Sequence, residues 1–278
     1  MVLSHFQVEP MLQAGARSRE TIFASLDLNL TTSEVYLHEN GIVLPDGQSL
    51  TWHTLELIAD DEVGCYHIEG GQAKRIQVYS EDLDRSYSLM PTPRAPALLI
   101  SGLPMHRIKG IDPREDTLRK IRTLSPVRGH VLDTATGLGY TAIEVARTAE
   151  QVTTIELDPA ALQIARLNPW SHPLFADPRI RQIVGDSAEE VAGFEENVFS
   201  CVIHDPPTIS LAGELYSAEF YRQLFRVLRR PGKVFHYIGD LESPSGRRVS
   251  KGVTRRLREV GFTRIVAWPD AFGVTACK

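Results

Sequence analysis

The chain has 278 residues, a net charge of −5 and 42% hydrophobic residues, a composition typical of a folded protein with one large or two modest domains. The negative charge provides no global basic field for nucleic acid, and no apolar run approaches the ~18 residues of a transmembrane helix. Three isolated cysteines form no Cys-x-x-Cys pair, which argues against a zinc site or a disulfide framework. With no signal-peptide pattern at the N-terminus, we expect a cytoplasmic protein with no membrane partner.

The N-terminal part of the chain is typical of short strands. Residues 1–20 give no clear pattern and could be a frayed arm. Glycine-containing turns then separate several short apolar runs, and helical spacing is found only near 51–59. The predicted strands are 21–24, 34–37, 41–44, 76–79 and 97–100. We therefore predict a small β-rich domain over residues 1–102, which could be a substrate lid, an oligomerisation surface or a packing extension.

Residues 103–278 are predicted to form a second domain. After a connector to residue 111, Asp112 is a good N-cap, Pro113 suits the first helical position and Glu115 completes a capping box. The expected apolar side of this helix comprises Leu118, Ile121 and Leu124, and Ser125-Pro126 should end it.

From residue 130 strands alternate with helices, which predicts a doubly wound, Rossmann-like parallel sheet of α/β class. The predicted strands are 131–132, 152–155, 180–184, 199–203, 233–238, 263–268 and 274–277. Pro231-Gly232 is expected to end a helix over 218–228, and 239–250 to form a loop before a last helix that ends at Gly261. The last two strands have no helix between them, so they should form a hairpin, with the final strand of this seven-stranded sheet antiparallel.

A glycine turn follows the first strand of this alternation. Gly137 and Gly139 would let the backbone approach a ligand, although Gly-x-Gly-x-x-Ala is also a loose dinucleotide fingerprint and fits an ordinary strand–turn–helix. Asp133, four residues before Gly137, is more specific, since a carboxylate there can accept from the ammonium of a bound amino acid. These residues resemble motif I of the class I S-adenosylmethionine (SAM) methyltransferases.

Acids also end the next two strands, where doubly wound sheets bind ligands. Glu156 could accept both ribose hydroxyls, whereas Asp158 before Pro159 is the better N-cap. Asp186 resembles the family acid that accepts from the adenine amine, with an N-cap as the alternative role. The resemblance implies SAM as the cofactor, no metal, and a binding set of Asp133, Thr136, Gly137, Gly139, Tyr140, Thr141, Glu156, Leu157, Asp186, Ser187 and Asp205.

The fourth strand runs into His204-Asp205-Pro206-Pro207-Thr208, which resembles the methyltransferase motif Asp/Asn-Pro-Pro-x that holds a target amine. Asp205 is the main catalytic candidate, followed by His204 and Tyr216. His204 could be a base or a structural residue. Thr208 replaces the aromatic residue that base-methylating members usually carry, which weakens a nucleic-acid reading.

A second resemblance covers Ser210–Tyr221 and Leu228–Gly232, which are similar to spermidine synthases. Those enzymes share the fold and an N-terminal β domain, and transfer aminopropyl from decarboxylated SAM. In those enzymes an acid directly after the glycines binds the aminopropyl amine, whereas Tyr140 occupies that position in this chain. As a whole the chain resembles a spermidine-synthase-like family of mostly archaeal-type methyltransferases.

The resemblance implies methyl transfer to an amine or similar nucleophile. An aminopropyltransferase and a non-catalytic SAM-binding protein are the alternatives, and the intact Asp205-Pro206-Pro207 argues against the last. The acceptor could be a small amine, or an RNA held by the 247–258 basic stretch. A solvated helix face is the commoner explanation of such a stretch. The chain could also form a homodimer. Trp170 could cover a ligand or fill the sheet edge. The basic residues are Arg247, Arg248, Lys251, Arg255, Arg256 and Arg258.

Overall fold

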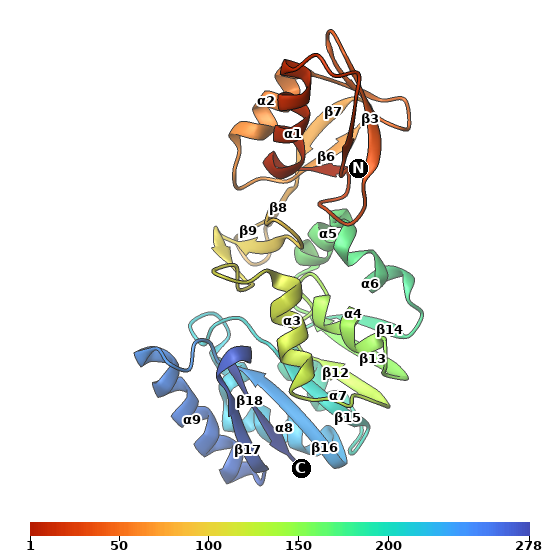
Figure 1. Ribbon diagram of the computed structural model, residues 1–278. Helices are drawn as coiled ribbons and strands as arrows, with labels where there is room; N and C mark the ends of the chain where they lie inside the picture. The colour runs from red at the N-terminus through yellow and green to blue at the C-terminus, as the bar shows by residue number, and fades with distance from the viewer. The chain divides into compact units, whose positions relative to one another are not determined.

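A computed structural model describes residues 1–278, which form two compact units (Figure 1). The first unit comprises Met1–Arg114 and Ala160–His172, and the second comprises Glu115–Pro159 and Pro173–Lys278. The domain boundary between residues 102 and 103 stays a prediction.

The first unit contains three antiparallel sheets, with strand orders β1-β6-β7, β2-β3-β4-β5 and β11-β10-β9-β8. Its strands are β1 (Val2–Leu3), β2 (Thr21–Ala24), β3 (Ser33–His38), β4 (Gly41–Val43), β5 (Ser49–Thr51), β6 (Tyr66–Glu69), β7 (Gln72–Arg75), β8 (Gln77–Ser80), β9 (Arg85–Met90), β10 (Ala97–Ile100) and β11 (Leu103–Pro104). Its helices are α1 (His5–Ala16), α2 (Trp52–Asp60), all but the first residue of α5 (Pro159–Leu167), and the short 3-10 helix η1 (Pro169–Ser171).

The first twenty residues are ordered, so the expectation of a frayed arm is wrong. Helix α1 begins with a capping box in which the Ser4 backbone N–H donates to Gln7 Oε1 over 2.9 Å. Its buried side chains, Val8 and Met11 among them, belong to the core of the first unit. Pro10 lies inside this helix, and a proline there is a sequence signal against helix.

The predicted strands of the first unit are confirmed, as is the helix near 51–59, which matches α2. Strands β1, β5, β6, β7, β9 and β11 were not predicted. Strand β7 illustrates why: its four residues are Gln-Ala-Lys-Arg and are mostly exposed, so it shows no apolar alternation. It pairs with β6 across the Gly70-Gly71 turn.

The second unit is built on one seven-stranded sheet with the order β14-β13-β12-β15-β16-β18-β17 (Figure 1). Its strands are β12 (His130–Asp133), β13 (Gln151–Glu156), β14 (Ile180–Val184), β15 (Phe199–His204), β16 (Leu228–Tyr237), β17 (Thr263–Trp268) and β18 (Gly273–Cys277). Strands β12 to β16 are parallel, and β18 runs antiparallel between β16 and β17. The predicted doubly wound sheet with an antiparallel last strand is confirmed.

Helices α7, α8 and α9 pack in succession and share one core with the sheet, in which Phe199, Tyr221 and Leu257 are buried. None of the helices is long and apolar enough to cross a membrane. The helices of this unit are α3 (Pro113–Arg122, apart from its first two residues), α4 (Tyr140–Ala146), α6 (His172–Ala176, apart from its first residue), α7 (Ser187–Gly193), α8 (Ala218–Val227) and α9 (Pro244–Val260), with 3-10 helices η2 (Gly213–Tyr216) and η3 (Pro269–Ala271).

Two boundaries differ from the prediction. Helix α8 passes directly into β16 at Leu228, so Pro231-Gly232 does not end a helix. Phe199 pairs with Leu228 and Cys201 with Lys233, which makes residues 229–232 a bulge inside β16. The predicted loop 239–250 is also too long, because α9 starts at Pro244, where the Ser243 side chain accepts from the Gly246 N–H.

Candidate active site

The predicted site residues lie at one edge of the second unit's sheet. Asp133 and Glu156 are the last residues of β12 and β13, Asp205 directly follows β15, and Asp186 comes two residues after β14. The carboxyl ends of parallel strands meet at the same edge, which is where doubly wound sheets bind ligands (Figure 1).

The turn after β12 needs its glycines for backbone reasons. Gly137 and Gly139 have φ of +52° and +76°, in the left-handed region that glycine tolerates best. A Cβ on Gly139 would lie 2.7 Å from a Leu174 methyl carbon, so no larger residue fits without displacing Leu174. The turn therefore passes close to its neighbours whether or not a ligand is bound.

Asp133 is a fully buried acid with no cationic hydrogen-bond partner. Its Oδ2 accepts from Thr141 Oγ1 over 2.7 Å and its Oδ1 from the Ala135 N–H. Burial, helped by the nearby Asp205 and opposed by the hydrogen bond from Thr141, raises the pKa of Asp133 to about 7. A ligand cation would stabilise the ionised form, so this position suits the ammonium of a SAM-type ligand.

Glu156 is held by the backbone of the glycine turn. Its Oε2 accepts from the Gly137 N–H over 2.7 Å, its Oε1 accepts from the Asp158 N–H over 3.2 Å, and burial raises its pKa. A carboxylate offers about four acceptor positions, so about two remain for a pair of hydroxyls such as those of a ribose. The side chain of the next residue, Leu157, is 49% exposed and can offer an apolar contact to a base.

Other predicted binding residues have structural roles in this unit. Asp186 caps α7 by accepting from the Ala188 N–H over 2.6 Å, so its contact with an adenine amine stays a prediction. Ser187 Oγ donates to the Thr134 carbonyl, and Thr136 bonds Thr154 through their hydroxyls. Tyr140 is buried at the start of α4.

Asp205 carries a partner that the sequence did not reveal. Lys120 Nζ lies 2.6 Å from Asp205 Oδ2 and 2.9 Å from Asp116 Oδ2, and 4.5 Å from the centre of the Tyr237 ring. Lys120 and Asp116 are 5% and 1% exposed, whereas Asp205 is 19% exposed. One oxygen of Asp205 thus already holds an ammonium of the chain, and the other faces no hydrogen-bond donor of the protein.

The charges of this cluster follow from its geometry. Burial lowers the pKa of Lys120, but Asp205 and Asp116 outweigh that effect and raise it above the ordinary lysine value, so Lys120 is an ammonium. Burial raises the pKa of Asp205, and Lys120 opposes this shift. The predicted apolar side of α3 is only partly right. Leu124 is buried, but Leu118 and Ile121 are half-buried, and the buried residues of the helix include Asp116, Thr117 and Lys120. The Asp116-x-x-x-Lys120 spacing was the available signal.

His204 has no nitrogen left for a substrate. Its Nε2 lies 2.9 Å from the Leu215 carbonyl, an acceptor, so Nε2 carries the hydrogen and Nδ1 accepts from Thr134 Oγ1 at 2.7 Å. The side chain is fully buried, and burial lowers its pKa to about 3. The geometry thus contradicts His204 as a base and supports the structural reading.

Tyr216 holds the loop that follows Asp205. Its hydroxyl donates to the Pro207 carbonyl over 3.0 Å, and the ring is 3% exposed. Burial and the charge of Asp205 both raise the pKa of Tyr216, so its phenol stays neutral. These contacts give Tyr216 a positioning role next to Asp205.

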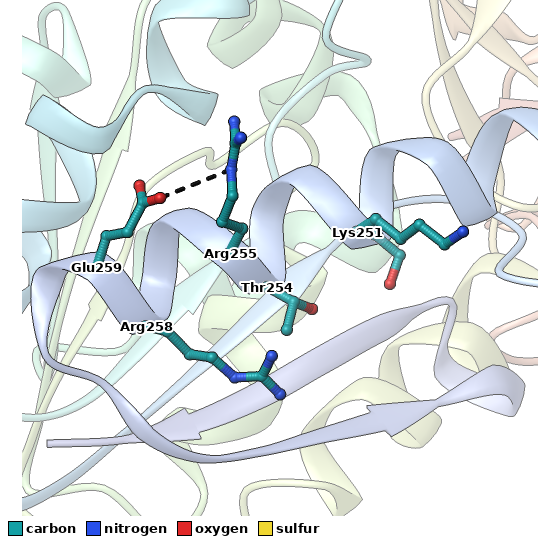
Figure 2. A pocket seen from close by; sticks show the side chains of 6 residues that line it. Lys251, Thr254, Arg255, Arg258 and Glu259 are labelled. Carbon is teal, nitrogen blue, oxygen red and sulfur yellow. Dashed lines mark ion pairs between the residues drawn. The ribbon is translucent and has the colours of Figure 1, made fainter.

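The 247–258 basic stretch lies on α9, where it lines a shallow pocket of about 360 Å³ (Figure 2). Arg255 Nε lies 3.7 Å from Glu259 Oε1, and Figure 2 shows Arg258 pointing to the other side of the helix. All the basic residues of the stretch are exposed except the half-buried Arg256. RNA binding through this face stays a prediction.

Trp170 is part of the first unit. Its Nε1 donates to the Leu28 carbonyl over 2.9 Å, and the Arg114 guanidinium lies 5.8 Å from the centre of its ring. A ligand-covering role is therefore not needed to explain its position, because the indole is already held by the chain.

A methyltransferase domain family model matches residues 132–236. "Uncharacterized protein MJ1233" of Methanocaldococcus jannaschii is 42% identical over 265 residues, which cover 93% of this chain and 90% of that protein.

Two enzymes match over shorter stretches. A polyamine aminopropyltransferase of Aeropyrum pernix is 35% identical over 106 residues, 36% of this chain and 33% of the enzyme. Putrescine N-methyltransferase 3 of Nicotiana tabacum is 29% identical over 102 residues, 35% of this chain and 26% of the enzyme. The chain therefore matches about a third or less of the length of either enzyme.

Among solved structures, a spermidine synthase in complex with the transition state analogue AdoDATO superposes with a TM-score of 0.60 at 20% identity. The superposition covers 77% of this chain and 78% of that one. At this identity the likeness establishes a common fold.

Proposed function

We propose, from the premise that this chain belongs to the spermidine-synthase-like family of class I SAM-dependent methyltransferases, that it transfers a methyl group from SAM to an amine or similar nucleophile. The observation that carries the proposal is the pair of acids Asp133 and Asp205, close enough that Asp205 raises the pKa of Asp133. Asp133 has no cationic partner in the protein, and Lys120 holds only one oxygen of Asp205. A bound cation would stabilise the ionised forms of both acids, so the pair favours cationic ligands.

The residues that would hold SAM are those at the strand ends. Asp133 would accept from its ammonium and Glu156 from its ribose hydroxyls, while Leu157 offers the base an apolar contact. SAM supplies a methyl group on a sulfonium, which needs no further activation. The remaining catalytic task of the protein is to place a nucleophile with a free lone pair, and correct placement can supply up to ~7–11 kcal/mol.

Asp205 is the residue we assign to that task. Lys120 holds one of its oxygens, and Pro206 and Pro207 restrict the backbone that follows, so the second oxygen is presented in a fixed direction. That oxygen can accept an N–H of the acceptor amine and take up its proton. Tyr216 supports this arrangement by holding the Pro207 carbonyl.

Aminopropyl transfer from decarboxylated SAM is the second candidate. The spermidine synthase likeness over 77% of the chain and the aminopropyltransferase match favour it. Against it, Tyr140 occupies the position where the sequence resemblance implies an acid that grips the aminopropyl amine. Incubating the protein with labelled SAM or labelled decarboxylated SAM in fractionated cell extract, with and without ribonuclease, separates the two reactions and tests RNA as the acceptor. Transfer from decarboxylated SAM alone would replace the first candidate by the second.

Cofactor binding can be tested before the acceptor is known. Glu156→Ala should weaken SAM binding by ~1.5–3 kcal/mol in calorimetry, the scale of lost charge-assisted hydrogen bonds. Glu150→Ala is the matched control, since Glu150 is an exposed acid just before the opposite end of the same strand. An intact protein that binds neither SAM nor S-adenosylhomocysteine would contradict the proposal.

A further inference from the structure

A second concave feature lies at the opposite edge of the same sheet. It is a cavity of about 550 Å³ where β12, β15 and β16 begin, and its volume is in the range of small-molecule sites. No aspartate or glutamate is among its lining residues. Five cations line it, namely Arg128, Arg229, Lys233, Arg264 and Lys278.

These cations come from separate segments of the chain and are mostly unpaired. Arg128 precedes β12, Arg229 and Lys233 are in β16, and Arg264 is in β17. None of these four has an ion pair or a side-chain hydrogen bond with the protein, whereas Arg179 and Arg222 elsewhere on the surface are paired with acids. Because these cationic side chains come together from different segments, the cavity differs from a solvated helix face, whose charges all come from one helix.

The backbone around the cavity is irregular where it presents these side chains. Arg229 lies in the 229–232 bulge of β16, and Arg264 has φ of +47° at a register break in β17 between Thr263 and Val266. Bulges commonly redirect side chains. Gly129 has φ of +75°, and a Cβ on it would lie 3.2 Å from Arg229 Nη2 and 3.1 Å from Ser200 Oγ. The glycine therefore leaves space where a guanidinium and a hydroxyl approach each other.

The local charge is unbalanced although the whole protein is acidic, with a net charge of −5. Burial lowers the pKa of Lys278, and the neighbouring Arg230 lowers it further, against a smaller opposite effect of Glu196. A concave site lined by charges of one sign concentrates their field and attracts ions of the other sign. The cavity is therefore suited to an anion.

We propose that this cavity binds the phosphate groups of an anionic ligand. Arginine forks match phosphate oxygens with two parallel hydrogen bonds, and three arginines, Arg128, Arg229 and Arg264, belong to the lining. The site goes beyond the proposed methyl transfer, because the six residues of β15 place it about 20 Å from the Asp205 edge. The phosphates could belong to a nucleotide-like molecule or to a nucleic-acid backbone.

The test uses the full chain and three probes: inorganic pyrophosphate, ATP and a 20-base-pair RNA duplex. The cavity variant is Arg229→Gln/Arg264→Gln, and the matched control is Arg17→Gln/Arg19→Gln, which removes two exposed arginines of the first unit. Binding is measured by calorimetry at low and high salt, and SAM binding reports that each variant is folded. We expect pyrophosphate and ATP to bind the unaltered chain. Their affinity for the cavity variant should be at least tenfold lower, and their affinity for the control should be about the same as for the unaltered chain.

The duplex identifies the source of the phosphates. The source is a nucleic acid if the duplex binds the unaltered chain and the cavity variant changes that binding in two ways. Its affinity for the duplex should be lower, and the slope of the logarithm of the binding constant against the logarithm of the salt concentration should be smaller by about 2. If pyrophosphate and ATP bind but the duplex does not, the source is a small phosphorylated molecule. Absence of binding of all three probes, or equal losses in the cavity variant and the control, would overturn the proposal.

Discussion

The two edges of the seven-stranded sheet carry opposite charges. At the carboxyl edge, Asp133 and Glu156 end their strands, Asp205 directly follows β15, and the ammonium of Lys120 pairs with Asp205. At the amino edge the lining of the cavity holds five cations and no acid. The same strands β12 and β15 connect both edges. The residues after a parallel strand and those before it can therefore evolve different chemistry without changing the strand between them.

The edges also differ in burial. The charges at the carboxyl edge are buried and held by hydrogen bonds, so removing one leaves its partners without compensation. Most cations at the amino edge are exposed, so salt screens them and their loss should change ligand binding more than folding. The predictions below test the carboxyl edge, from the largest expected effect to the smallest.

Lys120→Met should have the largest effect. The substitution leaves Asp116 and Asp205 without their ammonium, and breaking a buried ion pair in this way costs about 3–5 kcal/mol of unfolding free energy. Urea unfolding measures the loss. Arg119→Met is the control on the same helix, since its 3.3 Å pair with Glu115 is more exposed and should contribute ~0–1 kcal/mol. A loss for Lys120→Met no greater than for Arg119→Met would mean that the cluster is hydrated.

Asp205→Ala should lower single-turnover transfer by at least ~10²-fold while SAM affinity changes little, because Asp205 is assigned to the acceptor. Asp205→Asn keeps an acceptor oxygen. It should be milder if Asp205 mainly orients the amine, and equally severe if Asp205 removes the proton. Near-normal turnover by Asp205→Ala would move the chemistry elsewhere, with Tyr216 as the next residue to change, since the nitrogens of His204 are both engaged.

SAM affinity should depend on pH through Asp133. Its pKa of about 7 lies above its ordinary value, so the ligand-free protein keeps this acid protonated below pH 7. A bound ammonium favours the ionised form, so SAM binding should be about tenfold weaker at pH 6 than at pH 8, since one pKa unit equals ~1.4 kcal/mol.

The same titration affects the ligand-free fold in the opposite direction. A carboxyl group with a raised folded-state pKa contributes stability that is fully present below about pH 4 and is lost as the pH rises to about 7. Calorimetry at pH 6, 7 and 8 gives the SAM affinities, and Asp133→Asn is the control in which the dependence should vanish. A dependence that persists in Asp133→Asn would have to come from another group.

The sequence predicted the sheet well because its signals are local. Strand β12 ends in Asp133 and β15 is followed directly by Asp205, both after short apolar runs, and the absence of a helix before β18 dictates a hairpin. The residues at the carboxyl ends were found for the same reason. The N-terminal helix α1 was missed because Pro10 masked its pattern.

The features that were missed depend on pairing between distant segments. Lys120 and Asp205 are 85 positions apart, so nothing local to Lys120 indicates that its ammonium reaches Asp205. The bulge at 229–232 exists only because Cys201 pairs with Lys233 while Phe199 pairs with Leu228. Since the cavity is formed by such irregularities, no run of neighbouring residues predicts it.

The register break in β17 has a consequence for the behaviour of the protein at high concentration. Strand β17 is the last strand of the sheet, so its outer backbone groups have no neighbouring strand. A regular row of such groups is a template on which a second chain can add and begin an aggregate. The left-handed backbone of Arg264 interrupts that row, and its charge repels an identical strand. The same irregularity that lies beside the cavity at Arg264 thus also protects β17, the outermost strand, from pairing with a strand of another copy.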